Sequence, residues 1–303
     1  MAAASKVVSM IFAVALCLQT NLTRFEFTQV HMGTPFVLTL YAPSASKASD
    51  IARSVYARLR SLDETLSDYQ QNSELNTVLK SAWKRPTACG EDLVFMLRQS
   101  IRVAKLTYSA FDPTVGPLVQ VWRTARKTGI LPSVSVIEEA KRSVGIDGIR
   151  LSSNMRTLFV FPRTVRIDFG GIAKGYACDE AIRICRQGGI SDALIEGGGD
   201  LKASGTPPGE KGWNVTIQGS NQKFLLKDQA LSTSGSTEQF VEIGGVRYSH
   251  IVDPRTGYGL THLRQCTVVA KEGLLTDPLA TAGCVEPDSL KNLQGIQVFF
   301  NQR

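Results

Sequence analysis

Residues 166–176 read Arg-Ile-Asp-Phe-Gly-Gly-Ile-Ala-Lys-Gly-Tyr, and no other stretch of the chain constrains the fold as strongly. The pattern predicts a strand that ends at Asp168, a close turn at two glycines and a helix with Lys174 in its first turn. Unpaired N–H groups at the start of a helix, with an ammonium group beside them, form a binding site for phosphate. A tight connection between a strand and a helix gives the same pattern without a ligand, so both interpretations stand at this point.

Two common nucleotide-binding motifs are absent from the sequence. Gly170 and Gly175 have the spacing of a P-loop, but Tyr176 stands where that loop requires a lysine. The G-x-G-x-x-G pattern of dinucleotide-binding folds does not occur either. The sequence therefore excludes a P-loop protein and a Rossmann fold.

The regions on both sides of this stretch predict a mixture of helices and strands. Apolar residues recur at helical spacing in several segments, and short alternating runs bounded by turn-forming residues predict the strands. The predicted helices cover 48–62, 91–104, 138–144 and 172–187, with a last one starting near 277. The predicted strands cover 25–30, 35–42, 157–161, 165–168, 193–196, 213–219, 223–228, 240–245, 246–252 and 265–270. Without a fixed repeat or a long linker, this order predicts one compact α+β domain.

The composition indicates a globular protein and narrows what it can bind. Hydrophobic residues make up 43% and charged residues 20% of the 303 residues, which is typical of a chain with a packed core. The formal net charge is +7, from 34 basic and 27 acidic side chains that are spread along the chain. This distribution disfavours nucleic-acid binding and permits a site for an anionic ligand.

The few histidines and the spacing of the cysteines exclude several kinds of metal or redox site. The chain has 3 histidines, so a site with several histidine ligands is nearly excluded. The 6 cysteines contain no C-x-x-C pair, which excludes a zinc ribbon and a thioredoxin-like motif. Cys178 and Cys185 lie on one face of a predicted helix, where we expect them to be small buried residues.

The first residues have the features of an export signal. Residues 7–18 are almost wholly apolar, but this run is too short to span a bilayer comfortably. Residues 13–15 read Ala-Val-Ala, a possible cleavage site, and Cys17 would permit anchoring to the membrane through a lipid. We predict a signal at 1–19, a domain at 20–303, and a periplasmic or cell-envelope location. A buried N-terminal strand or helix is the alternative.

Two further clusters carry residues that suit catalysis. His250 ends a predicted strand and precedes the turn Asp253-Pro254, so it suits a general base, although a lone histidine is more often structural. Asp277 and Thr281 are four residues apart and share a face of a helix, where a carboxylate and a hydroxyl suit Mg²⁺. Alternatively, Thr276 or Asp277 is the N-cap of that helix.

The motifs of this chain, in their order, resemble those of the ApbE family of FAD:protein FMN transferases. The resemblance runs from residue 31 to residue 281 and covers most of the chain. The matching segments are MGT (32–34), SDYQQNSELN (67–76), FDPTVGPLVQVW (111–122), IDFGGIAKGYACD (167–179), EGGGDLKASG (196–205), STSG (232–235), SHIVDPRTG (249–257) and DPLATA (277–282). Pro278, the segment 282–284 and Glu196 depart from the family pattern, but none of them replaces a matched functional residue.

The resemblance implies a duplicated α+β unit that forms one catalytic domain, and it implies specific roles for eleven residues. The residues implied to contact FAD are Met32, Tyr69, Ala110, Phe111, Asp112, Asp168, Lys174 and Ile251. The main chain of Gly171, with Asp277 and Thr281, is implied to hold Mg²⁺. We assign proton removal to His250, and Asp277 is the alternative, either together with His250 or in its place.

The implied reaction moves FMN from FAD onto a threonine hydroxyl of an acceptor protein and releases AMP. The implied acceptor is a subunit of a membrane redox complex that carries a flavinylation motif. Two alternatives remain open from the sequence: an FAD pyrophosphatase that uses water as acceptor, and a flavin-binding protein without turnover.

Overall fold

The structure is a computed structural model that describes residues 22–152, 154, 156–217, 222–235 and 239–302. The predicted signal at 1–19, with Cys17, lies outside the described residues. Among the described residues, no helix combines the length and the apolar character that crossing a membrane requires.

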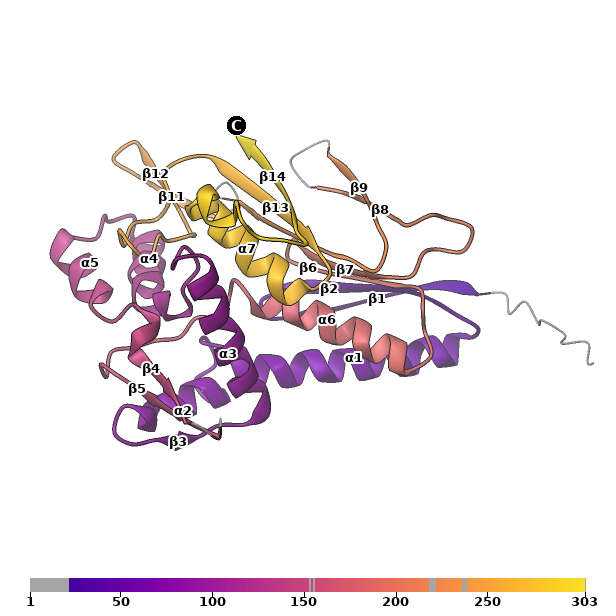
Figure 1. The fold of residues 1–303 in the computed structure, drawn as a ribbon, viewed down its shortest axis with the longest axis horizontal. Helices are drawn as coiled ribbons and strands as arrows, with labels where there is room; N and C mark the ends of the chain where they lie inside the picture. The colour runs from indigo at the N-terminus through magenta and orange to yellow at the C-terminus, as the bar shows by residue number, and fades with distance from the viewer. Residues whose placement is uncertain (1–21, 153, 155, 218–221, 236–238, 303) are drawn as a thin grey trace, which may run out of the picture.

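A seven-stranded antiparallel sheet forms the largest layer of the fold (Figure 1). Its strands follow the order β1-β2-β6-β7-β10-β13-β14. They are β1 (Thr23–His31), β2 (Thr34–Ala42), β6 (Ala193–Gly197), β7 (Asp200–Ser204), β10 (Ala230–Gly235), β13 (Arg264–Ala270) and β14 (Gln297–Gln302). The predicted hairpin at 25–42 is confirmed: β1 and β2 pair throughout, and they are joined at Met32 and Gly33, whose φ angles are 50° and 76°.

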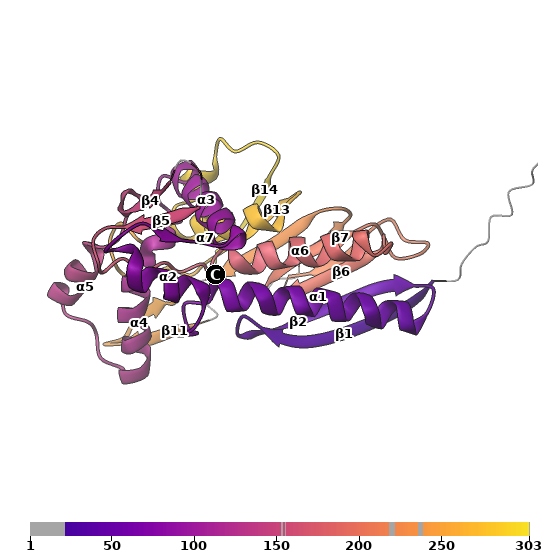
Figure 2. The same ribbon diagram turned by 90° about the horizontal axis from the view of Figure 1, so that it is seen from below.

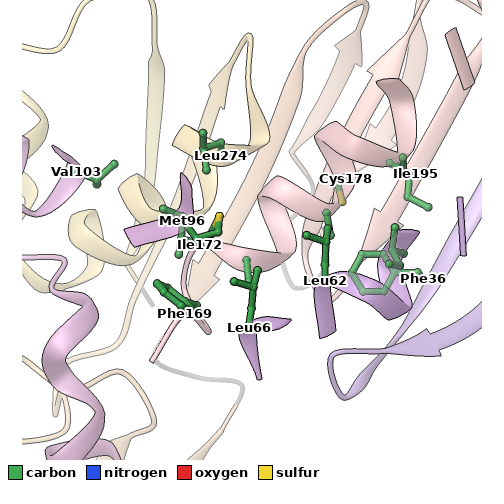
Figure 3. Close-up of a cluster of buried hydrophobic side chains, with 14 of the residues drawn as sticks. Phe36, Leu62, Leu66, Met96, Val103, Phe169, Ile172, Cys178, Ile195 and Leu274 are labelled. Atoms are coloured by element: carbon green, nitrogen blue, oxygen red, sulfur yellow. The ribbon is translucent and has the colours of Figure 1, made fainter. Parts of the chain in front are cut away.

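Three helices cover one face of this sheet (Figure 2): α1 (Ala45–Leu66), α6 (Ala173–Gln187) and α7 (Gly273–Val285). α1 packs against β1 and β2, α6 against β6 and β7, and α7 against β10 and β13. Ser44 is the N-cap of α1, and its side chain accepts a hydrogen bond from the N–H of Lys47 in the first turn. Apolar side chains from the helices and the sheet form the main core, in which Figure 3 shows Phe36, Leu62 and Cys178. Cys178 and Cys185 are both buried, which confirms the prediction that they are small buried residues.

The other face of the sheet is partly covered by a two-stranded hairpin. Its strands are β8 (Trp213–Thr216) and β9 (Lys223–Leu226). Trp213 packs on Tyr41 of β2 with 5.9 Å between the ring centroids, within a smaller apolar cluster. The hairpin therefore lies across the sheet from the three helices.

The remaining elements form a second lobe at one end of the sheet, at the left of Figure 1. They are α2 (Glu74–Ala82), β3 (Thr87–Ala88), α3 (Glu91–Leu106), α4 (Gly116–Thr128), α5 (Val134–Lys141), β4 (Ile149–Leu151), β5 (Thr157–Val160), β11 (Phe240–Ile243) and β12 (Val246–Ser249). The Trp122 indole of α4 donates to the carbonyl oxygen of Gly257 at 2.8 Å and stacks on Tyr248 of β12. This contact fixes the segment around His250 against α4.

The backbones of α6 and α7 touch where the two helices cross. A Cβ atom added to Gly175 would collide with the carbonyl oxygen of Gly273, and one added to Gly273 would collide with that of Gly175. Both positions therefore require glycine, and the crossing brings the first turns of both helices together.

The structure confirms the α+β fold but corrects the prediction in three places. Residues 165–168 are not a strand, because the N–H of Asp168 pairs with the carbonyl of Pro113 instead of a sheet neighbour. The last helix begins at Gly273, so neither Thr276 nor Asp277 is its N-cap, and Pro278 lies inside it. The predicted helix at 138–144 instead covers Val134–Lys141.

Candidate active site

A cleft of about 1380 Å³ lies between the main sheet and the second lobe. All twelve residues that the sequence singled out contribute to its lining: Met32, Tyr69, Ala110, Phe111, Asp112, Asp168, Gly171, Lys174, His250, Ile251, Asp277 and Thr281. Met32 and Thr281 are 249 positions apart in the sequence, so the fold gathers distant segments into one place.

Asp277 lies buried at the floor of the cleft, on α7. One of its carboxylate oxygens, Oδ2, accepts a hydrogen bond of 3.1 Å from the backbone N–H of Gly175 in the first turn of α6. Burial and the neighbouring Asp200 carboxylate raise the pKa of Asp277 to about 7, although Lys174 and this hydrogen bond oppose the shift. A cation that binds here would replace the proton that the carboxyl group otherwise holds at lower pH.

Lys174 stands between two carboxylates. Its Nζ lies 2.8 Å from Asp200 Oδ2 and 3.6 Å from Asp277 Oδ2, and it donates to the carbonyl oxygen of Gly170 at 3.2 Å. Burial acts to lower the pKa of Lys174, but the two carboxylates outweigh burial and raise it, so the ammonium stays charged. The start of α6 therefore combines an ammonium with the positive end of a helix dipole.

Two other segments of the chain lie close to Thr281, one helical turn after Asp277 on α7. A Cβ atom added to Gly171 would lie 3.1 Å from Thr281 Oγ1, so the Gly171 main chain approaches that hydroxyl closely. Thr281 Oγ1 also lies 3.2 Å from Ser234 Oγ of β10. A carboxylate, hydroxyls and main-chain oxygens are the hard ligands that Mg²⁺ prefers, so this donor set fits the predicted metal. Among the described residues, no group of three or more His, Cys, Asp or Glu side chains is placed to hold a metal ion, so a metal at this site would depend on hydroxyl and main-chain oxygens as well as on Asp277.

A second charged group lines the opposite wall of the cleft. Arg123 of α4 pairs with Asp68 at 2.5 Å and with Asp168 at 3.3 Å, and its guanidinium lies 3.9 Å from the ring centroid of Tyr69. Asp168 also accepts from the N–H of Gly170 at 2.7 Å, while burial and Asp68 raise the pKa of Asp168. The Tyr69 ring is 73% exposed, so one of its faces is available for stacking.

The segment 110–112 forms a buried part of the lining. Asp112 accepts hydrogen bonds from the N–H and the hydroxyl of Thr114, at 2.8 and 2.5 Å, and caps a short 3₁₀ turn. Burial raises the pKa of Asp112, against the effect of these two hydrogen bonds. The carboxyl group of Asp112 therefore already stabilises this turn. A contact with a ligand would come in addition to that role.

His250 lies half-buried beside β12, and its surroundings favour the neutral ring. Its Nδ1 is 3.1 Å from the carbonyl oxygen of Gln239, and a carbonyl oxygen only accepts, so this contact requires the proton on Nδ1. Burial lowers the pKa of His250, and the charges of Arg126 and Lys174 lower it further. The ring therefore carries a free lone pair on Nε2 at neutral pH.

The last two predicted residues, Met32 and Ile251, lie in turns outside the regular helices and strands. Met32 lies in the left-handed region of the β1–β2 turn, and its N–H donates to Asp63 Oδ2 at 3.1 Å. Ile251 is buried, and its N–H donates to the hydroxyl of Ser249. Both residues contribute main-chain and apolar surface to the cleft.

Sequence reasoning missed three residues of this site: Asp200, Arg123 and Ser234. Asp200 directly follows three glycines, and this pattern alone does not indicate a role for the acid. Arg123 lies on α4, which the sequence analysis did not predict as a helix. Ser234 lies in a run of serines and threonines that is typical of a turn, yet it belongs to a central strand.

Comparison with known proteins connects this cleft to a described family. The sequence model of the ApbE family matches residues 32–300. The chain is 29% identical over 284 residues to the FAD:protein FMN transferase of Klebsiella pneumoniae, covering 88% of this chain and 81% of the relative. It is 28% identical to the enzyme of the same name from Escherichia coli K12, again over 88% of this chain and 81% of the relative.

Solved structures support the same relationship. The flavin transferase ApbE of Vibrio cholerae superposes with a TM-score of 0.83 at 25% identity, over 92% of this chain and 93% of that one. The ApbE protein of Thermotoga maritima superposes with a TM-score of 0.82 at 26% identity, over 92% and 97%. The similarity therefore extends over nearly the whole of each fold.

Proposed function

The chain belongs to the ApbE family, and on that basis we propose that it is an FAD:protein FMN transferase that uses Mg²⁺ and modifies a threonine. The observation that carries this proposal is the convergence of Asp277, Thr281 and Gly171 with Lys174 and His250 in one cleft. A passive flavin-binding protein would have little need for a buried carboxylate and a cation-binding set of oxygens.

We assign the metal to the oxygens of Asp277, Thr281 and the Gly171 main chain. When bound, Mg²⁺ would neutralise the charge of the FAD pyrophosphate and favour the departure of AMP. Lys174 and the N–H groups that begin α6 supply further positive potential for the same phosphates. These residues bind and orient the pyrophosphate, which is most of what phosphoryl transfer requires of a protein.

We assign the acceptor's proton to His250. The threonine oxygen forms a bond to the phosphorus of the FMN half, and the bond between that phosphorus and the bridging oxygen of AMP breaks. The hydroxyl proton passes to Nε2 of His250, whose lone pair is free because Nδ1 carries the other proton. The negative charge that develops on the bridging oxygen leaves with AMP, on its phosphate group.

An experiment with an acceptor distinguishes transfer from hydrolysis. Residues 20–303 are incubated with FAD, Mg²⁺ and a protein that carries an exposed flavinylation threonine, and both AMP and the acceptor's intact mass are measured. AMP with one FMN added to the acceptor is the expected result. AMP with free FMN alone would instead indicate an FAD pyrophosphatase, and bound, intact FAD would indicate a flavin-binding protein.

We also propose that the protein works outside the cytoplasm. The apolar run at 7–18 and the Ala-Val-Ala sequence that it contains support export, and an exported transferase would meet acceptor subunits of membrane redox complexes. Expression of the full chain followed by N-terminal sequencing of the envelope fraction tests this. A chain that begins at Met1 and stays in the cytosol would contradict it.

A further inference from the structure

Asp179, on α6, holds the first turn of α7 through two hydrogen bonds. Its Oδ1 accepts from the backbone N–H of Gly273 at 2.9 Å, and its Oδ2 accepts from that of Leu274 at 2.8 Å. The residue at the N-cap of α7, Glu272, makes no side-chain capping bond of its own. The cap of α7 therefore comes from a residue 94 positions earlier in the chain.

The start of α6 is in turn capped by a residue of α7. Gly175 in the first turn of α6 donates to Asp277 of α7, and Ile172, at the N-cap of α6, makes no side-chain cap. Each helix thus has a glycine where it meets the other and, four residues later, an aspartate that caps the other helix. Of the two aspartates, Asp277 lines the cleft and Asp179 does not.

A cation stabilises the Asp179 carboxylate in this buried place. Nζ of Lys202 lies 3.3 Å from Asp179 Oδ1, and the Lys202 side chain is 8% exposed. Lys202 also donates to the carbonyl oxygen of Lys271, two residues before α7 begins. The pair of Asp179 and Lys202 therefore ties both the start of α7 and the segment that leads into it to α6 and β7.

We propose that Asp179 is a positioning residue for flavin transfer, which sets Asp277 and Thr281 against the start of α6. Asp277 lies one helical turn and Thr281 two turns after the residue that Asp179 caps, so the direction of α7 fixes both. Loss of the cap frees this first turn and spreads the positions of the metal oxygens, without removing any atom from the cleft. This inference rests on the proposed function, because it concerns the same metal site.

The test compares Asp179→Asn with a matched change one residue further along α6. An asparagine has the same size, but its single carbonyl oxygen accepts only one of the two N–H bonds. Mn²⁺ serves as a spectroscopic probe for the metal, and its affinity is measured by electron paramagnetic resonance in the presence of FAD. We expect Asp179→Asn to weaken Mn²⁺ binding by about 10- to 100-fold, the usual effect of losing a group that orients metal ligands.

Glu180→Gln is the control. Glu180 pairs with Arg58 and Arg183, each at 2.7 Å, and makes no contact with α7 among its hydrogen bonds. Its replacement should lower the melting temperature and leave the Mn²⁺ affinity unchanged. In the transfer assay, Asp179→Asn should lower kcat with little change in the KM for FAD, and Glu180→Gln should change neither.

The outcomes separate this inference from the function on which it rests. If wild-type protein binds Mn²⁺ and Asp179→Asn binds it equally well, Asp179 is only structural and the proposal is overturned. If the wild-type protein binds no Mn²⁺, the metal part of the proposed function fails and this inference fails with it.

If Asp179→Asn does not fold, Lys202→Gln is tested instead. This variant keeps the two hydrogen bonds that Asp179 accepts from α7, but it removes the ammonium group beside Asp179. A severalfold loss of Mn²⁺ affinity is then expected, and an unchanged affinity would overturn the proposal.

Discussion

The carboxylate of Asp277 accepts a hydrogen bond of 3.1 Å from the N–H of Gly175, a residue 102 positions earlier in the chain. The residue at the N-cap of α6 makes no capping hydrogen bond with its side chain. Asp277 of α7 therefore supplies the acceptor for the N–H of Gly175. The same carboxylate is therefore a structural cap and the charged group at the floor of the cleft. Changes at this position should affect stability and activity in opposite directions.

Asp277→Asn should stabilise the metal-free protein at pH 8. The pKa of Asp277 is raised to about 7 in the folded protein, whereas an aspartate in an unfolded chain has a pKa of about 3.9. Between these values the folded state holds a proton that the unfolded state has released, so stability falls as the pH rises from 4 to 7. Above pH 7 the full penalty of the buried charge remains.

Denaturant unfolding in EDTA at pH 5 and pH 8 measures this effect. The variant should be more stable than the wild type by at most about 4 kcal/mol at pH 8, the free energy that corresponds to a rise of the pKa from about 3.9 to about 7, and by less at pH 5. Mg²⁺ should stabilise the wild type and not the variant. A variant that is less stable than the wild type at pH 8 would show that the charge contributes favourably to the fold.

Lys174→Ala should weaken the binding of FAD much more than that of riboflavin. Only FAD presents a pyrophosphate to the ammonium, and a hydrogen bond to a charged group contributes about 1.5–3 kcal/mol, or roughly 10- to 150-fold in affinity. Quenching of flavin fluorescence gives both dissociation constants, and Lys174→Arg, which keeps the charge, serves as the control. An equal loss for the two ligands would contradict a role in phosphate binding.

His250→Gln should reduce kcat by about 10²- to 10⁴-fold, the usual contribution of a general base, and leave the KM for FAD nearly unchanged. Because burial lowers the pKa of His250 below its ordinary value of 6.5, proton removal by His250 should slow only when the pH drops below 6.5, measured in saturating Mg²⁺ so that the cation displaces the proton of Asp277. Single-turnover rates between pH 5 and pH 8 test both expectations.

His262→Gln is the matched control, since His262 is exposed and does not line the cleft. It should keep kcat within about twofold of the wild type, because glutamine can also donate to the Cys284 carbonyl oxygen, which lies 3.0 Å from Nε2 of His262. If His250→Gln transfers FMN at the wild-type rate, proton removal must be assigned to another group, with Asp277 the first to examine.

Gly175→Ala should destabilise the protein and weaken its metal binding together. The added methyl group would collide with the Gly273 carbonyl, and overpacking of this kind costs about 1–3 kcal/mol. Gly209→Ala is the control: its φ is 81° and no atom lies within 4 Å of the added Cβ, so it costs about 1–2 kcal/mol of backbone strain alone. Urea unfolding and Mn²⁺ titration should show metal loss in the first variant only. Normal Mn²⁺ affinity in Gly175→Ala would show that the crossing does not position the metal oxygens.

Helices and strands whose apolar residues recur at a regular spacing could be predicted from the sequence. The hairpin at 25–42 and the helix that follows Ser44 have regular patterns because each buries one face against the same core. Residues 165–168 misled the prediction for a related reason. Val165 and Ile167 are both buried and alternate as in a strand, but they pack from an irregular segment that pairs with the turn at Pro113.

Long-range contacts account for most of what the sequence could not predict. Asp277 follows a threonine and precedes a proline, which is typical of a helix start, yet its helix begins at Gly273 because Asp179 caps it there. Strand β10 contains Ser232 and Ser234, which look like turn residues. They are stable in a central strand because their hydroxyls meet Thr276 and Thr281 of α7 at 2.7 and 3.2 Å.

The crossing of α6 and α7 also has the form of a two-fold symmetric contact. In such a contact, residue i of one copy meets residue j of the other, and residue j meets residue i. Gly175 meets Asp277, and Gly273 meets Asp179, with the same spacing of four residues in both helices. The contact therefore acts equally in both directions, so a change at either glycine would disturb the first turns of both helices. The two aspartates differ in their surroundings: Asp277 lines the cleft, whereas Asp179 pairs with Lys202 away from it.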